Sequence, residues 1–154
     1  MASQGKTGIG SYIEATTDLV DPALAKDETN YAALTNFKAS NEEISVGSNG
    51  STNSIVSYTT IRDGQTNKRV SFSDQGTMQL QFAWNVEDDL QVLLKAAAKS
   101  KARITVRENL SDGTVSYFEC YVSSATKNTG DGNSVIMFDA TAEITTEILE
   151  ILPA

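Results

Sequence analysis

The densest apolar pattern in the chain runs from Met78 to Lys99 and changes its period halfway. Over Met78–Trp84 every second residue is apolar and large, which predicts a strand with one buried face. After Asn85 the apolar residues recur at helical spacing, which predicts an amphipathic α-helix over about residues 86–99. Asn85 itself is a suitable N-cap, because its side chain can accept a free backbone N–H. This helix must cover an apolar surface, and the sheet of the preceding strand is the nearest one.

Shorter stretches of alternating and β-branched residues predict further strands on both sides of this unit. They cover residues 12–17, 31–38, 43–46, 55–61, 68–73, 102–108, 115–125 and 134–145. Turn residues separate several of them at hairpin distances, as at Asp63-Gly64 and Ser111-Asp112-Gly113-Thr114. The predicted fold class is therefore mainly β: an antiparallel β-sandwich or barrel with one flanking α-helix.

The pattern also suggests how the domain is organised. We expect residues 1–154 to form a single domain, because this length can bury one sizeable core. Residues 1–10 contain three glycines and predict a flexible N-terminal arm, whereas residues 146–154 form an apolar C-terminal arm that something should cover. A long inter-strand loop is expected at about 47–67, with a polar tip at 47–53, and loops of this length are more often functional than decorative.

Charge and cysteine content narrow the possible functions. The formal net charge is −8 and the sequence pI is about 4.4, which disfavours a nucleic-acid binder that neutralises phosphates with Lys and Arg. Cys120 is the only cysteine, so an intrachain disulfide and a cysteine zinc site are excluded. The sequence shows neither a long apolar run nor a secretory signal, which predicts a protein made in the cytoplasm without a membrane anchor.

The residues offer little catalytic chemistry. The chain contains no histidine, which excludes Ser-His-Asp and Cys-His catalysis and histidine metal ligation. The acidic pairs Glu42-Glu43 and Asp88-Asp89 could serve general acid–base catalysis, but solvated surface acids are the more common reading of such pairs. Asp131-Gly132-Asn133 lacks the ligand spacing of a calcium loop. We therefore expect no enzyme activity, no cofactor and no metal site.

Three short segments, and the order of the elements around them, are similar to those of a known family. They are Phe82-Ala83-Trp84 at a strand end, the turn Ser111-Asp112-Gly113-Thr114-Val115, and Val122-Ser123-Ser124 at a later strand end. Together with the acidic start of the Leu-Leu helix, they resemble the major tail tube proteins of long, non-contractile-tailed bacteriophages of the lambda type. The resemblance covers roughly residues 30–146.

That resemblance implies a tail-tube fold whose copies assemble into homohexameric rings. The rings would stack into a hollow tube that conducts double-stranded DNA into the host cell without binding it specifically. The implied partners are the chain itself, tail tip or baseplate proteins, tail terminator proteins, and a tape measure protein in the lumen. The implied location is the virion tail, after synthesis in the host cytoplasm.

The resemblance also suggests which residues do the work. In such proteins the long excursion between early strands and the terminal arms make the contacts between rings. The predicted inter-ring residues are Gly47, Ser48, Asn49, Gly50, Ser51, Thr52, Asn53, Ile148, Leu149, Ile151 and Leu152. An acidic lumen would repel DNA at short range, and we expect Glu119, Asp139 and Glu143 to line it. Asp139 and Glu143 have the same strand parity and could share a face.

Two other classes of function stay open at this point. One is a related ring or tube component with the same fold, such as a tail completion protein or a type VI secretion tube protein. A ring that stacks indefinitely would distinguish a tube subunit from a capping ring. The other is a monomeric β-sandwich binding module, such as a carbohydrate binder. Trp84, the only tryptophan, ends an apolar stripe, which favours a core position over an exposed sugar platform.

Overall fold

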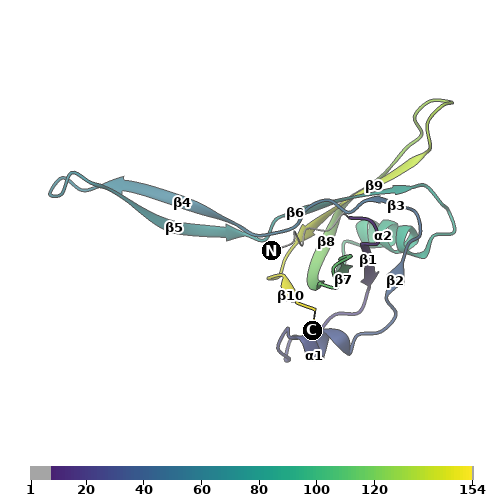
Figure 1. The fold of residues 1–154 in the computed structure, drawn as a ribbon, viewed down its shortest axis with the longest axis horizontal. Helices are drawn as coiled ribbons and strands as arrows, with labels where there is room; N and C mark the ends of the chain where they lie inside the picture. The colour runs from purple at the N-terminus through teal and green to yellow at the C-terminus, as the bar shows by residue number, and fades with distance from the viewer. Residues whose placement is uncertain (1–7, 154) are drawn as a thin grey trace, which may run out of the picture.

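The computed structural model describes residues 8–153, which form a β-sheet body and a long hairpin that projects from it (Figure 1). The elements in chain order are β1 (Tyr12–Thr16), α1 (Glu28–Ala32), β2 (Lys38–Ala39), β3 (Glu43–Ser45), β4 (Thr52–Thr59), β5 (Thr66–Asp74), β6 (Thr77–Ala83), α2 (Asp89–Ser100), β7 (Arg103–Asn109), β8 (Val115–Asn128), β9 (Met137–Ile144) and β10 (Leu149–Ile151). The strand pairs are antiparallel, so the predicted mainly β, antiparallel fold class is confirmed.

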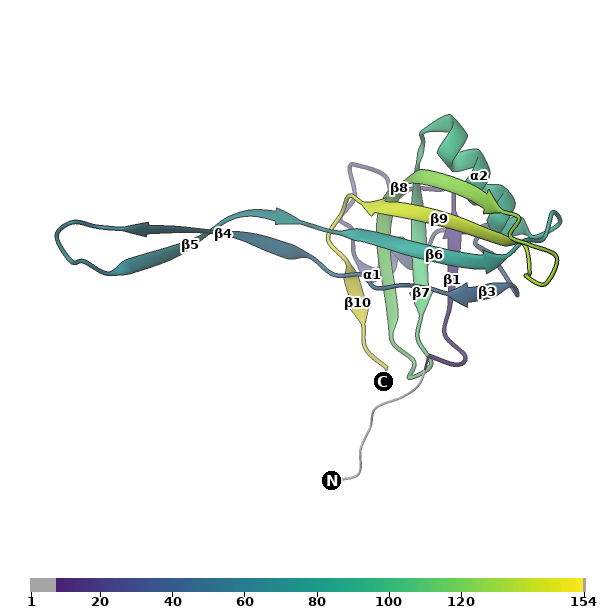
Figure 2. The same ribbon diagram turned by 90° about the horizontal axis from the view of Figure 1, so that it is seen from above.

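The body is built around the long strand β8. The strand order is β2-β1-β7-β8-β9-β6-β3, with β10 also paired to β8. The first half of β8 pairs with β7 and β10, whereas β9 pairs with β8 from Cys120 to Asn128, with a register shift between Val122 and Ser124. Such a bulge bends a strand and increases its twist. In Figure 2, β6 and β9 accordingly cross β1 and β7 at a steep angle, so β8 belongs to two layers.

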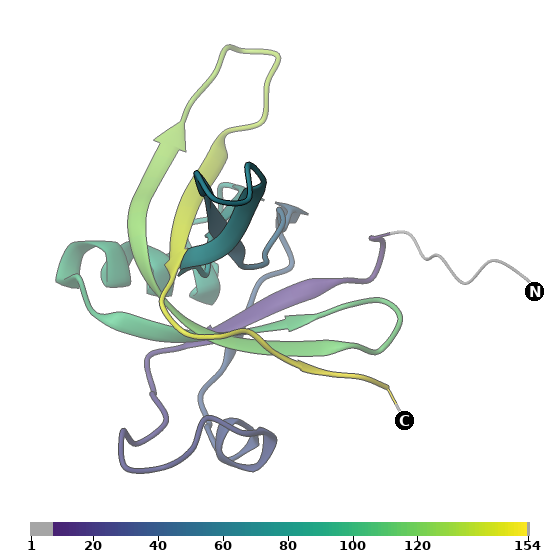
Figure 3. The same ribbon diagram turned by 90° about the vertical axis from the view of Figure 1, so that its left-hand side faces the viewer.

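The hydrophobic core lies between these layers and beneath α2. Met78, Leu80 and Phe82 of β6 are buried, which confirms the predicted alternation. They pack with residues from β1, α2, β7, β8 and β9, among them Ile13, Leu90, Leu94, Ile104, Phe118, Cys120, Phe138 and Ala142. Each large buried side chain of this kind contributes about 1.5–3 kcal/mol. Figure 3 shows α2 flanking the body on the side opposite the segment that enters β1.

The predicted helix is present, but it begins at Asp89 rather than near residue 86. The expected N-cap at Asn85 is wrong: Asp88 caps the helix by accepting the Leu90 backbone N–H, while Asn85 accepts the N–H of Glu87 in the preceding turn. Asp88 also accepts hydrogen bonds from the Ser40 hydroxyl and the Gln91 side-chain amide. This buried network holds the helix start against the segment that follows β2, and so decides where the helix begins.

The strand expected at 31–38 is wrong, because Tyr31 and Ala32 end the short helix α1 and β2 begins only at Lys38. Asp27 accepts the Asn30 backbone N–H and caps α1, and Tyr31 on this helix stacks on Tyr117 with ring centroids 5.1 Å apart. Val20 completes this second apolar cluster, and Leu149 and Ile151 of β10 pack against it. The segment between β1 and β2 therefore covers the outer side of β7 and β8.

The long excursion contains the strands predicted at 55–61 and 68–73, but not the long loop predicted around them. The predicted loop at about 47–67 is largely wrong, because β4 and β5 pair with each other from Thr52↔Asp74 to Thr59↔Thr66. Its turn falls at Thr60–Gln65, where Asp63-Gly64 predicted one. Residues 47–53, expected as a polar tip, instead leave the body and start β4 at the base of the hairpin. Both the base and the tip of a hairpin are commonly rich in glycine and polar residues. The composition of residues 47–53 therefore could not show which of the two they form.

We predict that Gly47 is needed to keep the hairpin base against β6. Its φ is +68°, and a Cβ at this position would overlap the carbonyl oxygen of Gln79. Gly10 has a φ of +90°, yet its Cβ would make only an ordinary 3.8 Å contact. Gly10→Ala should lower the free energy of unfolding by about 1–2 kcal/mol through backbone strain alone, and Gly47→Ala by distinctly more. Urea unfolding would measure both, and equal losses would contradict the close packing at Gly47.

Candidate functional site

One outward face of the body is polar and carries two acids. β6 and β9 pair as Thr77↔Glu143, Gln79↔Thr141 and Gln81↔Asp139, while the residues between these positions are buried. We call Thr77, Gln79, Gln81, Asp139, Thr141 and Glu143 the polar face. None of its six positions carries a Lys or Arg. A surface of hydroxyl, amide and carboxylate groups offers phosphate groups no cation to bind.

The three acids predicted to line a lumen have different environments. Asp139 is half-buried and Glu143 is exposed on the polar face, where Glu143 accepts a hydrogen bond from the Thr77 hydroxyl at 2.6 Å. Glu119, in contrast, is 0% exposed. The prediction that Glu119 faces a lumen is therefore wrong for this chain. Glu119 has the same strand parity as Tyr121, which pairs with Glu143, but the segment before α1 covers this part of β8 and brings Lys26 onto the Glu119 carboxylate.

Glu119 instead belongs to a buried ion cluster. Lys26 donates to its Oε2, and Arg103 Nε lies 3.2 Å from its Oε1, within ion-pair distance but not aligned as a hydrogen bond. The Lys26 contact fixes the segment before α1 across β8. A buried carboxylate needs such partners, since an unpaired charge in the interior is strongly destabilising.

The hairpin β4–β5 exposes an unusual amount of apolar surface. Its exposed large side chains are Ile55, Val56, Tyr58, Ile61, Val70 and Phe72. Its strands pair only with each other, and Figures 1 and 2 show them extending away from the body. An isolated two-stranded hairpin is at best marginally stable in water. Large exposed apolar patches of this kind mark interaction surfaces.

The residues predicted for contacts between rings lie in different environments in the structure. Residues 47–51 lie at the hairpin base against the body, where Asn49 Nδ2 donates to Glu108 Oε1 at 3.0 Å, and Thr52 and Asn53 begin β4. Ile148, Leu149 and Ile151 are half-buried on their own body. Leu152 is the exposed apolar residue of this set. The more extensive exposed surface, on β4 and β5 beyond Asn53, was not included in the prediction.

The Trp84 side chain packs against its neighbours and is only partly exposed to solvent. Its ring lies 5.8 Å from that of Phe138, and the ammonium groups of Lys95 and Lys127 lie 4.8 and 5.2 Å from its centroid. Cations held this close to an indole are attracted by its ring quadrupole. A sugar would have to displace these lysines, so the geometry favours the predicted core position over a sugar platform.

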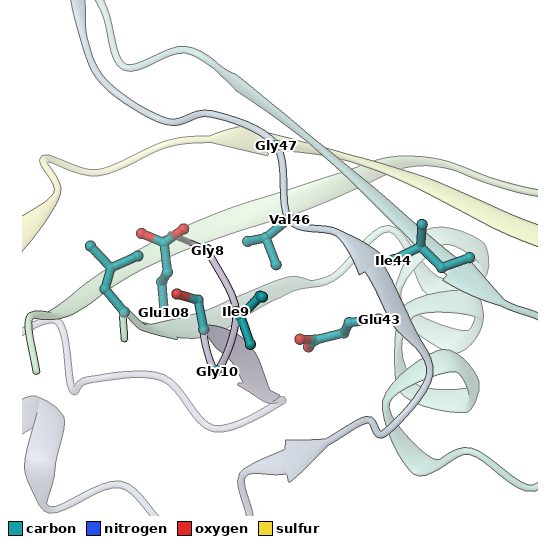
Figure 4. A pocket seen from close by; sticks show the side chains of 10 residues that line it. Gly8, Ile9, Gly10, Glu43, Ile44, Val46, Gly47 and Glu108 are labelled. Carbon is teal, nitrogen blue, oxygen red and sulfur yellow. The ribbon is translucent and has the colours of Figure 1, made fainter. Parts of the chain in front are cut away.

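A cleft opens between the edge of β3 and the segment that enters β1. It has a volume of about 530 Å³ and is lined by residues 8–11, Glu43, Ile44, Val46, Gly47, Glu108 and Leu110 (Figure 4). Glu43 Oε1 accepts the Ile13 backbone N–H at 3.0 Å. Sequence reasoning noticed Glu43 only as part of an acidic pair and missed Glu108, because nothing in the spacing of these two residues places them in one cleft.

Both cleft carboxyls are harder to ionise than usual. Burial raises the pKa of Glu43 to about 7, with smaller contributions from the negative charges of Asp88 and Glu14, against the lowering effect of the Ile13 hydrogen bond. Burial also raises the pKa of Glu108, while the Asn49 hydrogen bond opposes this. Within residues 8–153, no Lys or Arg forms a salt bridge with either group. The cleft therefore holds two acids whose charge is poorly compensated.

The described part of the chain shows neither a metal site nor a membrane helix. In residues 8–153, no three Cys, Asp or Glu side chains are grouped so that they could hold a metal ion. No helix in this range is long and apolar enough to cross a membrane. The predicted arm at residues 1–10 falls mostly outside the described residues.

The fold is the tail-tube fold, as comparison with solved structures shows. The chain is similar to a protein of the anti-feeding prophage baseplate (TM-score 0.69, 7% identity, covering 99% of this chain and 98% of that one). It is also similar to the sheath/tube terminator of the extracellular contractile injection system PVC (0.67, 11%, 98% and 99%). A third similarity is to the SPP1 tail tube (0.61, 10%, 93% and 77%). At these identities the likeness shows the fold alone.

Comparison of the sequence itself adds no relatives. No family model matches the chain, and no curated protein matches it. The structural similarities support the tail-tube fold that the sequence resemblance implied, and they do not single out the lambda-type proteins.

We predict that the Glu43 carboxyl makes stability fall as pH rises. Because its pKa is higher in the folded chain than the usual 4.5, the folded state holds a proton that the unfolded state releases between about pH 4.5 and 7. The stabilisation that the raised pKa of Glu43 gives to the folded state is complete below pH 4.5 and is lost as the pH rises through 7. Glu43→Gln keeps an oxygen for the Ile13 N–H and should gain stability relative to wild type as pH rises through this range. Urea unfolding at several pH values measures this, and a pH-independent difference would contradict it.

Proposed function

We propose that the chain is a structural ring component of a phage tail or contractile injection system, and specifically the subunit of a phage tail tube. The observation that carries this proposal is a hairpin with six exposed large apolar side chains on a tail-tube fold. Neither face of that hairpin is covered by its own body. Contacts with other copies of the chain would cover it and offset the cost of ordering a two-stranded ribbon.

In this proposal the rings are homohexamers that stack through their hairpins. The polar face would line the lumen, with Asp139 and Glu143 repelling the phosphates of double-stranded DNA as it passes. The proposed partners at the two ends of the tube are tail tip or baseplate proteins and tail terminator proteins. A tape measure protein is the proposed occupant of the lumen, and the virion tail is the proposed location.

A second candidate is a ring that ends or initiates a tube instead of repeating along it. The similarity to a tube terminator and to a baseplate protein, each over nearly the full length of both chains, favours this alternative. The two candidates differ in one property, because a tube subunit stacks without limit and a terminal ring does not. A type VI secretion tube protein would also stack, and differs in its cargo.

We predict that removing the hairpin abolishes tubes but leaves the body folded. Thr52 and Asp74 are paired across the hairpin base, so a short Gly-Ser linker can replace the residues between them. Wild-type protein should form hollow striated tubes in negative-stain electron microscopy, and the shortened chain should form none. As the matched surface control, Val92→Ser on the exposed side of α2 should leave tubes intact.

The same experiment can overturn the proposal. A wild-type chain that remains monomeric at every concentration would exclude a tube subunit, and single rings that never stack would favour the terminal ring. Normal tubes from the shortened chain would show that the hairpin does not join rings. Cooperative urea unfolding of the shortened chain verifies that its body is folded.

We predict that Asp139→Lys with Glu143→Lys leaves tubes intact but makes them bind and retain DNA. Two cations per subunit on the polar face would supply phosphate contacts, so retention should weaken steeply as salt rises from 50 to 200 mM. Co-sedimentation of tubes with duplex DNA measures retention, and DNA ejection from phage carrying the variant should slow. Glu28→Lys with Glu87→Lys, exposed acids outside the polar face, changes the net charge equally and is the control. Equal retention by both pairs would contradict a luminal polar face.

A further inference from the structure

The cleft between β3 and the start of β1 offers both apolar surface and carboxyl groups. It could therefore receive an apolar side chain together with a cationic one. Figure 4 shows Glu43 and Val46 approaching it from the β3 side and Ile9 from the segment before β1. Ile9 is 87% exposed although it lies at the cleft. The cleft therefore combines uncovered apolar surface with the carboxyls of Glu43 and Glu108, which no described Lys or Arg pairs.

The tip of the hairpin carries the complementary chemistry. The turn is closed by the Gly64 backbone N–H donating to the Thr60 carbonyl at 2.9 Å, and the Thr60 hydroxyl donates to the Asp63 carboxylate. Asp63 is thus turned back toward its own turn. Ile61 next to it is 104% exposed, and Arg62 is exposed beside it. The tip thus presents a large apolar side chain and, on the next residue, a guanidinium.

Charge is also divided between the hairpin and the body. From Thr52 to Asp74 the cations Arg62, Lys68 and Arg69 outnumber the anions Asp63 and Asp74 by one, whereas the whole chain has a formal net charge of −8. The hairpin is therefore a cationic projection from an acidic body. Complementary charge of this kind orients two surfaces as they meet and disfavours other registers.

The tip cannot use the cleft of its own chain. The eight residues of β4 span roughly 25 Å at the usual strand rise, and Figure 2 shows the hairpin running away from the body. The occupant of the cleft must then be supplied by another copy. A contact between unlike surfaces of identical chains is heterologous, and it leaves a free tip and a free cleft for the next copy.

We propose that Ile61 and Arg62 at the hairpin tip of one subunit enter the cleft of a subunit in the adjacent ring, where Arg62 pairs with the Glu43 and Glu108 carboxylates. Ile61 packs against Ile9 and Leu110, which removes its apolar surface from water. A guanidinium can hydrogen-bond a carboxylate through two N–H groups at once, so this contact also fixes orientation. The inference rests on the proposed stacking function and names the surface that receives the hairpin.

Paired cysteines test this contact in assembled tubes. In a chain carrying Ile9→Cys and Ile61→Cys, a short bismaleimide should join tip to cleft and give a ladder of covalent oligomers on a denaturing gel. Each single variant should give none. The native Cys120 should not react, because it is buried and burial raises its pKa to about 12. Adding Arg62→Glu should slow cross-linking roughly tenfold or more, and Lys68→Glu, with the same charge change, much less.

A control pair of cysteines separates failure of the proposed cleft contact from failure of the proposed tube function. Ile61→Cys with Val92→Cys places the second thiol on α2, outside the cleft, and should give no ladder. Tubes that form without a ladder from the Ile9 pair, or with equal ladders from both pairs, overturn the cleft as receptor while the tube function stands. A wild-type chain that forms no tubes overturns the proposed function and this inference with it.

Discussion

The bend in β8 is the constraint on which the rest of the body depends. One strand of 14 residues supplies the edge for β7 and β10 in one layer and for β9 in the other. Because the bulge near Ser123 turns the strand between layers, the two sheets enclose the core without a separate connection between them. The bend also leaves the outer side of the first half of β8 uncovered by sheet. The segment from Asp18 to Tyr31 covers it, through the Lys26–Glu119 ion pair and the Tyr31–Tyr117 stack.

This arrangement separates a well-packed body from a projection that has no core of its own. The aromatic and aliphatic side chains between the layers are almost fully removed from water, whereas the hairpin leaves Phe72 76% exposed. Burial stabilises the body alone, but the hairpin gains comparable stabilisation only when another surface covers it. In the proposed assembly, other copies of the chain would supply that surface.

The sequence predicted the elements whose period was long and regular, and it failed where tertiary contacts decided. The Met78–Trp84 strand and the helix after it follow directly from alternation and helical spacing. The first residue of the helix could not be predicted in this way, because it depends on Asp88 accepting a hydrogen bond from Ser40, which is far away in sequence. Glu119 was misplaced because Lys26, far away in sequence, lies over it and buries its carboxylate. Tyr31 was expected in a strand, but the Asp27 cap and the stack on Tyr117 place it in the short helix α1.

The distribution of charge explains how an acidic chain could bind copies of itself. At a net charge of −8, uniform copies would repel one another, and screening over a Debye length of about 8 Å removes only the longer-range part. Placing Arg62, Lys68 and Arg69 on the projection lets attraction act at the contact while the bodies stay acidic. The poorly compensated carboxyls of Glu43 and Glu108 are where an incoming cation gains most, because Glu108 is buried and Glu43 is partly buried. Asp139 and Glu143, on the polar face, need no such partner, and their charge stays available to repel a polyanion.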